Sequence, residues 1–280
     1  MPAFNEENSV GSVVDSYRRG LLAYFGSMDL FEILVVDDGS KDNTAEAARS
    51  HGATVLKNRT NRGYGATLKV GIHHARFDDI LITDADDTYH VEEAIKILDA
   101  REGCDMVIGA RTGRKRKIPL IRRPAKWILT KLASYLSGET IPDLNSGLRY
   151  FKKQGIKEYF HIISNGFSFT MTSTLAFISD GKEVVFVPIN YYARTGHSKI
   201  RPIRDTLLFL QVILRTIIYF NPLRVFLPMS VLLIAFGVGF GIYEVLVHKN
   251  ITDISLMTII SGVQLGATGL LADLIVRKNG

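Results

Sequence analysis

The stretch Glu32-Ile33-Leu34-Val35-Val36-Asp37-Asp38-Gly39-Ser40 decides the fold, because an unbroken apolar run ends there in two carboxylates. A second stretch further along the chain, Ile80-Leu81-Ile82-Thr83-Asp84-Ala85-Asp86-Asp87, repeats the pattern. A run that is apolar at every position is typical of a strand covered on both faces, as in a parallel sheet. In open α/β sheets ligands bind outside the carboxyl ends of the strands. Both acidic clusters are therefore expected to lie at one binding site.

Short β-branched runs alternate with helical patterns from residue 10 to about residue 200, which predicts an α/β domain with a parallel sheet. The first strand of such a domain is expected just ahead of Pro2, so we expect several residues before Met1 to be missing. Cys104 is the only cysteine, which excludes a disulfide framework and a thiolate metal site. Further strands are predicted at residues 32–37, 53–57, 79–83, 105–109 and 184–188.

An amphipathic helix is predicted at residues 201–221. Arg204, Gln211 and Arg215 form one polar stripe among leucine, isoleucine, phenylalanine and valine side chains. A helix of this kind lies in a membrane interface with its basic stripe toward the lipid headgroups. We therefore expect residues 201–221 to rest on a bilayer surface.

Residues 222–280 are predicted to form a membrane anchor of two transmembrane helices, at about 223–247 and 254–276. Each segment meets the length of about 20 apolar residues that a bilayer requires. Two spans place both ends of the chain on one side of the membrane. The basic residues that flank the spans put that side, with the N-terminal domain, in the cytoplasm under the positive-inside rule: Arg201, Arg204, Arg215, Arg224, Arg277 and Lys278.

Positive charge gathers between Arg111 and Lys131, where nine residues are Lys or Arg and none is acidic. This uneven distribution favours a local anionic partner over a uniformly basic surface. The run Arg114-Lys115-Arg116-Lys117 is expected to meet anionic lipid, at about 1 kcal/mol for each residue near the surface. A solvated loop and helix face is the alternative interpretation of the same run.

Asp84 and Asp86 are the candidate metal ligands, because alternate residues at a strand end can reach one hard divalent cation. Such a cation would bridge the oxygens of a diphosphate. A bare Asp-x-Asp pair more often marks a solvated turn. Here the buried strand that leads into it, and Asp37-Asp38 at the end of an earlier strand, favour the metal.

An ordered set of motifs resembles the family 2 glycosyltransferases, and among them the polyprenyl-phosphate sugar synthases of the dolichyl-phosphate mannose synthase type. The resemblance implies a GT-A fold for residues 1–200, a nucleotide-sugar donor and a polyprenyl phosphate acceptor, either dolichyl or undecaprenyl. The motifs occur in the family's order: Pro2-Ala3-Phe4-Asn5-Glu6-Glu7, Val35-Val36-Asp37-Asp38-Gly39-Ser40, Asn61-Arg62-Gly63-Tyr64-Gly65-Ala66, Asp84-Ala85-Asp86, Gly109-Ala110-Arg111, Asp143-Leu144-Asn145-Ser146-Gly147 and Arg194-Thr195-Gly196-His197-Ser198-Lys199.

The resemblance also implies roles for single residues. Asp84 and Asp86 would hold Mg²⁺ or Mn²⁺ against the donor diphosphate, and Asp86, Arg111, Arg194 and Lys199 would act in catalysis. The groups that would handle the donor diphosphate or the lipid phosphate are Arg111, Arg123, Ser146, Arg194 and Lys199. The nucleotide would be bound by Pro2, Ala3, Asn5, Glu6, Asp38, Asp84 and Ala85.

The sequence departs from the family at Thr88, where many relatives carry a glutamine that assists the metal. Asp87 is the candidate substitute as the third ligand. A polyprenyl phosphate is already an anionic nucleophile at neutral pH, so transfer to it needs no general base. The remaining tasks are to hold two anions together and to stabilise the departing nucleoside diphosphate. In-line displacement would invert the anomeric configuration.

Two alternative functions stay open. A glycosyltransferase that acts on a glycan or glycolipid hydroxyl would keep the fold but would need a positioned base. A haloacid-dehalogenase-like phosphatase would use Asp84 as nucleophile and Asp86 as general acid, in a strand followed by Asp-x-Asp-x-Thr. That motif normally opens its domain, whereas Asp37-Asp38 precedes it here.

Several properties of the reaction and of the assembly are left open. The donor can be GDP-mannose, a UDP-hexose or a UDP-N-acetylhexosamine. Apolar spans favour self-association into a homo-oligomer. No nucleic acid partner is expected.

Overall fold

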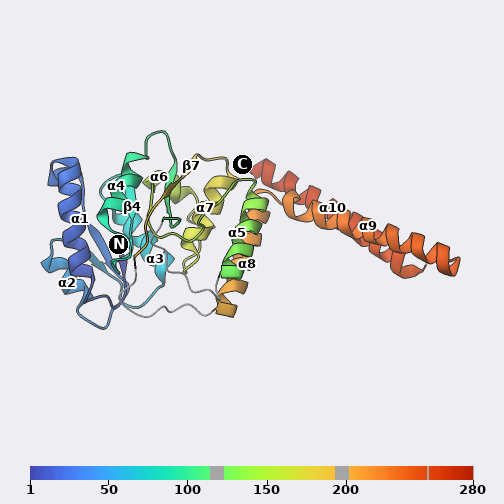
Figure 1. Ribbon diagram of the computed structural model, residues 1–280, viewed down its shortest axis with the longest axis horizontal. Coiled ribbons are helices and arrows are strands. Elements are labelled where there is room, and N and C mark those ends of the chain that lie inside the picture. Colours follow the sequence, from blue (N-terminus) through green and yellow to red (C-terminus); the bar gives the residue numbers. More distant parts are fainter. Residues whose placement is uncertain (114–122, 193–201, 251, 280) are drawn as a thin grey trace. The chain divides into compact units, whose positions relative to one another are not determined.

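The computed structural model describes the backbone of residues 1–113, 123–192, 202–250 and 252–279, and the side chains of these residues except 123–128, 202–206 and 279. The chain divides into two compact units, Met1–Val212 and Ile213–Gly280. Figure 1 follows the elements along the chain from blue to red. They are β1 (Pro2–Ala3), α1 (Val10–Phe25), η1 (Met28–Leu30), β2 (Leu34–Asp37), α2 (Thr44–Ser50), β3 (Thr54–Lys57), α3 (Tyr64–His74), β4 (Asp79–Ile82), α4 (Val91–Asp99), β5 (Met106–Ala110), α5 (Arg123–Ser137), β6 (Arg149–Lys152), α6 (Lys153–Glu158), α7 (Phe169–Ser179), β7 (Val184–Pro188), α8 (Pro202–Phe220), α9 (Leu223–His248) and α10 (Asp253–Asn279).

The strands of the first unit form two sheets, in the orders β1-β2-β3 and β4-β6-β5-β7. The first sheet is parallel, with Pro2 opposite Val36 and Val36 opposite Leu56. The second is mixed, because β6 is antiparallel to both β4 and β5 while β5 and β7 are parallel. The prediction of one parallel sheet is therefore wrong in detail. All five predicted strands are present: β7 has the predicted bounds, and the ends of the other four differ by at most two residues.

The antiparallel strand β6 was not predicted from the sequence, because a charged residue interrupts its apolar run. Arg149, Tyr150 and Phe151 are all buried, with exposed fractions of 0%, 1% and 0%. A buried arginine between apolar residues hides the continuous apolar pattern that marks a central strand.

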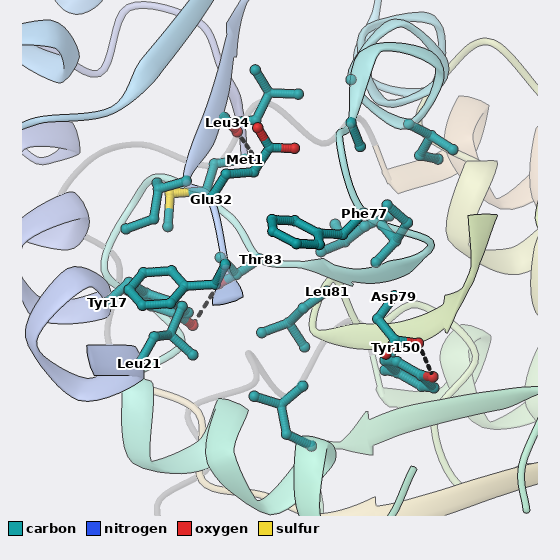
Figure 2. A pocket seen from close by; sticks show the side chains of 18 of the residues that line it. Met1, Tyr17, Leu21, Glu32, Leu34, Phe77, Asp79, Leu81, Thr83 and Tyr150 are labelled. Atoms are coloured by element: carbon teal, nitrogen blue, oxygen red, sulfur yellow. Dashed lines mark hydrogen bonds between the residues drawn. The ribbon is translucent and has the colours of Figure 1, made fainter. Parts of the chain in front are cut away.

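An apolar cavity of about 290 Å³ is lined by residues of β2 and β4, one strand from each sheet. Figure 2 shows Leu34, Phe77 and Leu81 among the side chains around it. The lining ends at Thr83, one residue before Asp84, and includes none of the carboxylates that follow β2 and β4. The cavity therefore belongs to the core beneath the strand ends and is separate from the candidate site described below.

The second unit contains the helical hairpin of α9 and α10 (Figure 1). Both helices are long and apolar enough to cross a membrane, which agrees with the two predicted spans. Their packing is close at glycines: a Cβ atom at Gly262 would lie 2.6 Å from Cγ1 of Ile234. Ser230 Oγ donates to the carbonyl of Gly262 at 2.7 Å. Small residues allow this close backbone approach, which is how transmembrane helices associate without a hydrophobic driving force.

Helix α8 is amphipathic, as the sequence predicts. Gln211 and Arg215 are exposed, whereas Ile213 and Ile217 on the opposite face are fully buried. The side chain of Arg204, the third residue of the predicted polar stripe, lies outside the described residues.

Packing around the cavity predicts that two leucine-to-alanine substitutions lower the free energy of unfolding by different amounts. Leu81→Ala is expected to lower the free energy of unfolding by about 2 kcal/mol, because Leu81 already lacks contacts on its cavity side. Leu175→Ala, in the fully buried helix α7, is expected to cost about 4 kcal/mol. Thermal unfolding of the full chain in detergent, followed by circular dichroism, compares the two. An equal or larger loss for Leu81→Ala would contradict the packing described here.

Candidate functional site

Asp38, directly after β2, organises the loop that leads into α3. Its Oδ1 accepts hydrogen bonds from the Asn58 side-chain amide and the Arg62 backbone amide, both at 2.9 Å. Its Oδ2 accepts from the amide of Gly63 at 2.9 Å. Asp38 is only 4% exposed, so these donors compensate a charge that burial would otherwise penalise. The predicted nucleotide-binding residue thus fixes the loop beside it.

The segment from Pro2 to Glu6 lies against the loop that follows β2. Asn5 has a positive φ of 55°, its amide donates to Ser40 Oγ at 2.9 Å, and its side-chain oxygen accepts from the amide of Lys41 at 3.0 Å. The amide of Glu6 donates to Thr44 Oγ1 at 2.9 Å. Contacts between residues more than 30 positions apart therefore form the wall predicted to bind the nucleotide. Pro2 and Ala3 take part as strand β1.

Ser9 connects this wall to the acidic turn after β4. Its hydroxyl donates to the carbonyl of Ala85 at 2.9 Å and is 3.2 Å from Glu6 Oε2. Ala85 is 2% exposed. The first and second acidic clusters of the sequence are thus brought to one region, as the strand-end argument predicts.

The acidic turn exposes its three carboxylates to different degrees. Asp84 is half-buried, and its Oδ1 accepts from the Tyr64 hydroxyl at 3.1 Å. Asp86 is 7% exposed, and its Oδ1 accepts from Thr88 Oγ1 at 2.6 Å. Asp87 is exposed and has a positive φ of 59°. Thr88, which stands where the family often has glutamine, therefore orients Asp86 by hydrogen bonding.

Tyr64 is held as a neutral hydrogen-bond donor. Burial, and next the nearby Asp84 carboxylate, raise the pKa of the Tyr64 phenol well above its ordinary value. The phenol ring also packs on Phe167, with ring centroids 5.6 Å apart. A protonated phenol at this place steadies Asp84 at neutral pH.

Arg111 and Asp143 form a two-pronged ion pair. Arg111 donates from Nε to Oδ2 at 2.6 Å and from Nη2 to Oδ1 at 2.9 Å, and its backbone amide also bonds Oδ2 at 3.1 Å. Asp143 is 1% exposed, and the guanidinium lies 5.2 Å from the centre of the Tyr191 ring. Burial alone would lower the pKa of Arg111, but nearby Tyr89 and Asp143 raise it above its ordinary value. Arg111 is therefore a fixed positive charge.

Ser146 and Gly147 form a buried turn next to Asp84. The amide of Gly147 donates to the Tyr89 hydroxyl at 2.9 Å, and that hydroxyl is 3.4 Å from Ser146 Oγ. A Cβ atom at Gly147 would lie 2.7 Å from Asp84 Oδ2, so only glycine leaves room for the carboxylate. Ser146, predicted to handle phosphate, has no exposed surface.

The sequence did not assign roles to four residues that build this site. They were hidden because each acts through a hydrogen bond to a distant part of the chain: Tyr64 bonds Asp84, Tyr89 bonds Gly147, Arg149 bonds the carbonyl of Thr170, and Asp143 bonds Arg111. Tyr64 and Asp143 stood in recognised motifs, but neither was assigned a role.

The side chains of three predicted site residues lie outside the described part of the structure. Arg194 and Lys199 lie outside the described residues. Arg123 begins α5, and its side chain is likewise outside the described part. Their roles stay predictions.

Residues 1–160 match the family described as glycosyl transferase family 2, and residues 221–277 match the GtrB C-terminal hairpin. "Glycosyltransferase AglJ" of Haloferax volcanii is 30% identical, over 98% of this chain and 92% of that protein. "Dolichyl-phosphate hexose transferase" of the same organism is 31% identical, over 72% of this chain and 85% of its own length. "Undecaprenyl-phosphate 4-deoxy-4-formamido-L-arabinose transferase" of Edwardsiella ictaluri is 26% identical, over 99% and 87%. The family match contradicts the phosphatase alternative.

Among solved structures, glucosyl-3-phosphoglycerate synthase of Mycobacterium tuberculosis with Mn²⁺, UDP and phosphoglyceric acid aligns with a TM-score of 0.57 and 20% identity. The alignment covers 77% of this chain and 76% of that one. Mannosyl-3-phosphoglycerate synthase of Rubrobacter xylanophilus gives a TM-score of 0.56 at 23% identity, over 77% and 70%. These likenesses confirm the predicted GT-A-like α/β fold.

The ion pair of Arg111 and Asp143 predicts a stability effect. Asp143→Asn keeps the size of the side chain but leaves the Arg111 guanidinium without its countercharge, so we expect the free energy of unfolding to fall by about 3 kcal/mol. The matched control is Asp15→Asn, because Asp15 is a solvent-accessible carboxylate beside His51. Thermal unfolding of both variants in detergent measures the difference, and equal melting temperatures would contradict a supporting role for the pair.

Proposed function

The chain belongs to glycosyltransferase family 2, and we propose that it transfers a sugar from a nucleotide diphosphate to a polyprenyl phosphate at a membrane surface. The observation that carries the proposal is one chain holding both a GT-A-like domain, with its acidic turn at the strand ends, and a long apolar hairpin. Relatives matched over most of their length are named as transferases to dolichyl and undecaprenyl phosphate. A lipid acceptor explains why the catalytic domain carries an anchor.

The donor site is proposed at the turn from Asp84 to Asp87. Within the described residues no group of three or more His, Cys, Asp or Glu side chains surrounds one point, so the protein alone does not complete a metal shell. Two carboxylates leave coordination positions for diphosphate oxygens and water, which is how Mg²⁺ and Mn²⁺ are bound beside phosphates. Asp84 and Asp86 would hold the metal. Asp87, the third ligand suggested by the sequence, does not gather with them around one point in the described residues and would have to move to bind it. The metal would supply charge to the departing nucleoside diphosphate.

The remaining donor contacts are proposed along the neighbouring strand end. Pro2, Ala3, Asn5, Glu6 and Asp38 would bind the base and ribose, with Ala85 beside them. Support comes from the hydrogen bonds that place Asn5 on Ser40 and Ser9 on Ala85, since they join these residues to the acidic turn.

The acceptor phosphate is proposed to meet Arg111. Asp143 engages Nε and Nη2, so within the described part of the chain Nη1 is the donor left for a phosphate oxygen. Guanidinium groups suit this contact because their planar fork matches phosphate oxygens. Arg123, Arg194 and Lys199 are proposed to share the handling of the lipid phosphate or the diphosphate. Ser146, whose side chain has no exposed surface, is proposed to act through the turn that it forms with Gly147.

The proposed reaction is a direct displacement. An oxygen of the polyprenyl phosphate attacks the anomeric carbon as its bond to the diphosphate oxygen breaks, so the configuration inverts. The nucleoside diphosphate leaves with the electron pair. Because the nucleophile is already ionised, Arg111 and its partners act by holding two anions together.

The membrane placement is also a proposal. The catalytic domain and both chain termini would face the cytoplasm, residues 201–221 would lie in the interface and residues 222–280 would span the bilayer twice. The exposed side chains of Gln211 and Arg215 support contact of α8 with lipid headgroups, whereas Ile213 and Ile217 are already buried by protein. A reversed or single-span topology would show in cysteine labelling from one side of sealed vesicles.

A sugar-transfer assay tests the function. Full-length protein in detergent is given Mg²⁺ or Mn²⁺, radiolabelled GDP-mannose, UDP-hexoses or UDP-N-acetylhexosamines, and dolichyl or undecaprenyl phosphate. We expect label to enter the organic phase from one donor and to be abolished by EDTA. Asp86→Asn should reduce the rate by about 100-fold or more, because it removes a ligand of the metal that would stabilise the departing diphosphate.

The control for this assay is Asp29→Asn, an exposed carboxylate in the short helix η1. Its rate should equal that of the unaltered protein. Absence of labelled lipid with every donor would overturn the lipid acceptor, and transfer to a glycan or glycolipid hydroxyl would then replace it.

A further inference from the structure

Arg149 is a fully buried cation whose described partners are all neutral. Its exposed fraction is 0%. Its five hydrogen bonds go to the carbonyl of Ser146 twice, to the carbonyl of Thr170, and to the hydroxyls of Ser173 and Thr174. Burial lowers the pKa of the guanidinium to about 10, which still leaves it charged at neutral pH. A buried charge whose hydrogen bonds all go to neutral groups is costly, although the nearby Asp143 carboxylate favours the charged form.

The guanidinium connects helix α7 to the turn at Ser146. On one side it donates from Nη1 to Thr170, at 2.9 Å, and to Ser173, at 2.8 Å. On the other side Nη2 and Nε both donate to the carbonyl of Ser146, at 2.6 and 3.2 Å. One planar group thus fixes the distance between the turn and α7.

The position of the turn at Ser146 and Gly147 limits where the Asp84 side chain can lie. Gly147 packs so closely on the carboxylate that a Cβ atom there would lie 2.7 Å from Asp84 Oδ2. Tyr64 holds Oδ1 of the same carboxylate at 3.1 Å. Asp84 is therefore confined between a hydroxyl and a turn, and Arg149 sets the position of the turn.

We propose that Arg149 is a positioning residue for the metal-binding carboxylate, acting on Asp84 through Ser146 and Gly147. This inference rests on the proposed function, in which Asp84 holds the divalent cation beside the donor diphosphate. Arg149 itself touches neither metal nor substrate, because Ser146 and Gly147 lie between. Its fork is needed because one ammonium group cannot reach acceptors on α7 and on the turn at once.

The test is Mn²⁺ binding to the full-length protein in detergent with UDP or, separately, GDP present, measured by electron paramagnetic resonance. Arg149→Lys keeps the charge and loses the fork, so the Kd for Mn²⁺ should rise about 10-fold or more. The matched control is Arg101→Lys, whose guanidinium also bonds a carbonyl and a hydroxyl, those of Leu98 and Tyr24. Its Kd should not change. A purely structural role for Arg149 would lower the melting temperature and leave the Kd of the folded protein unchanged.

A double-mutant cycle tests the route from Arg149 to Asp84. Gly147→Ala presses directly on the carboxylate and should weaken Mn²⁺ binding by itself. If Arg149 acts through this turn, Arg149→Lys in the Gly147→Ala background should add less than threefold. If the rise in Kd for the double variant equals the product of the rises for the two single variants, the proposed route is overturned.

Two further outcomes separate this inference from the proposed function. If the unaltered protein binds no Mn²⁺ with either nucleotide, the proposed metal site and the inference both fail. If it binds and Arg149→Lys binds equally well, the inference alone fails. Should Arg149→Lys not fold, Ser173→Ala removes one acceptor of the guanidinium and is expected to raise the Kd about threefold. An unchanged Kd in Ser173→Ala would then overturn the inference.

Discussion

The structure depends on the compensation of buried carboxylates, one after strand β2 and one in the loop before β6. Asp38 is 4% exposed and Asp143 is 1% exposed, and an isolated charge at either place would be strongly unfavourable. Two backbone amides and the side-chain amide of Asn58 stabilise the Asp38 carboxylate by hydrogen bonds. The Arg111 guanidinium neutralises Asp143 as an ion pair. Each carboxylate therefore dictates the path of a loop that would otherwise be free. The site is shaped by these requirements before any ligand arrives.

The same constraint explains why hydroxyl groups surround the acidic turn. Asp84 accepts from Tyr64 and Asp86 accepts from Thr88, so each carboxylate has one oxygen held by a neutral donor. Neutral donors orient a carboxylate without cancelling its charge. A cation in the same places would compete with a metal, whereas a phenol and a threonine hydroxyl do not. This arrangement is compatible with the divalent cation proposed to bind at the turn.

The sequence predicted the elements whose pattern is local. Apolar runs revealed β2 and β4 with their terminal carboxylates, and long uncharged segments revealed α9 and α10. It did not predict β6, because Arg149 breaks the apolar run, nor the division into two sheets around an apolar cavity. Tyr64 and Tyr89 were also missed, since their partners Asp84 and Gly147 lie 20 and 58 positions away. Spacing along a chain carries no information about such contacts.

Arg149 interrupts the sequence pattern of its own strand, and the same side chain also supports the turn beside Asp84. Its charge hides a central strand, yet its position in that strand is what lets the fork reach α7 and the Ser146 carbonyl together. A strand residue is held more rigidly than a loop residue, so a turn anchored to it inherits that rigidity. The acidic turn, by contrast, contains Asp87, which has a positive φ and an exposed carboxylate. In the proposed function, the rigid element behind Asp84 would fix one metal ligand, and the adaptable backbone at Asp87 would let a second carboxylate adjust as the diphosphate binds.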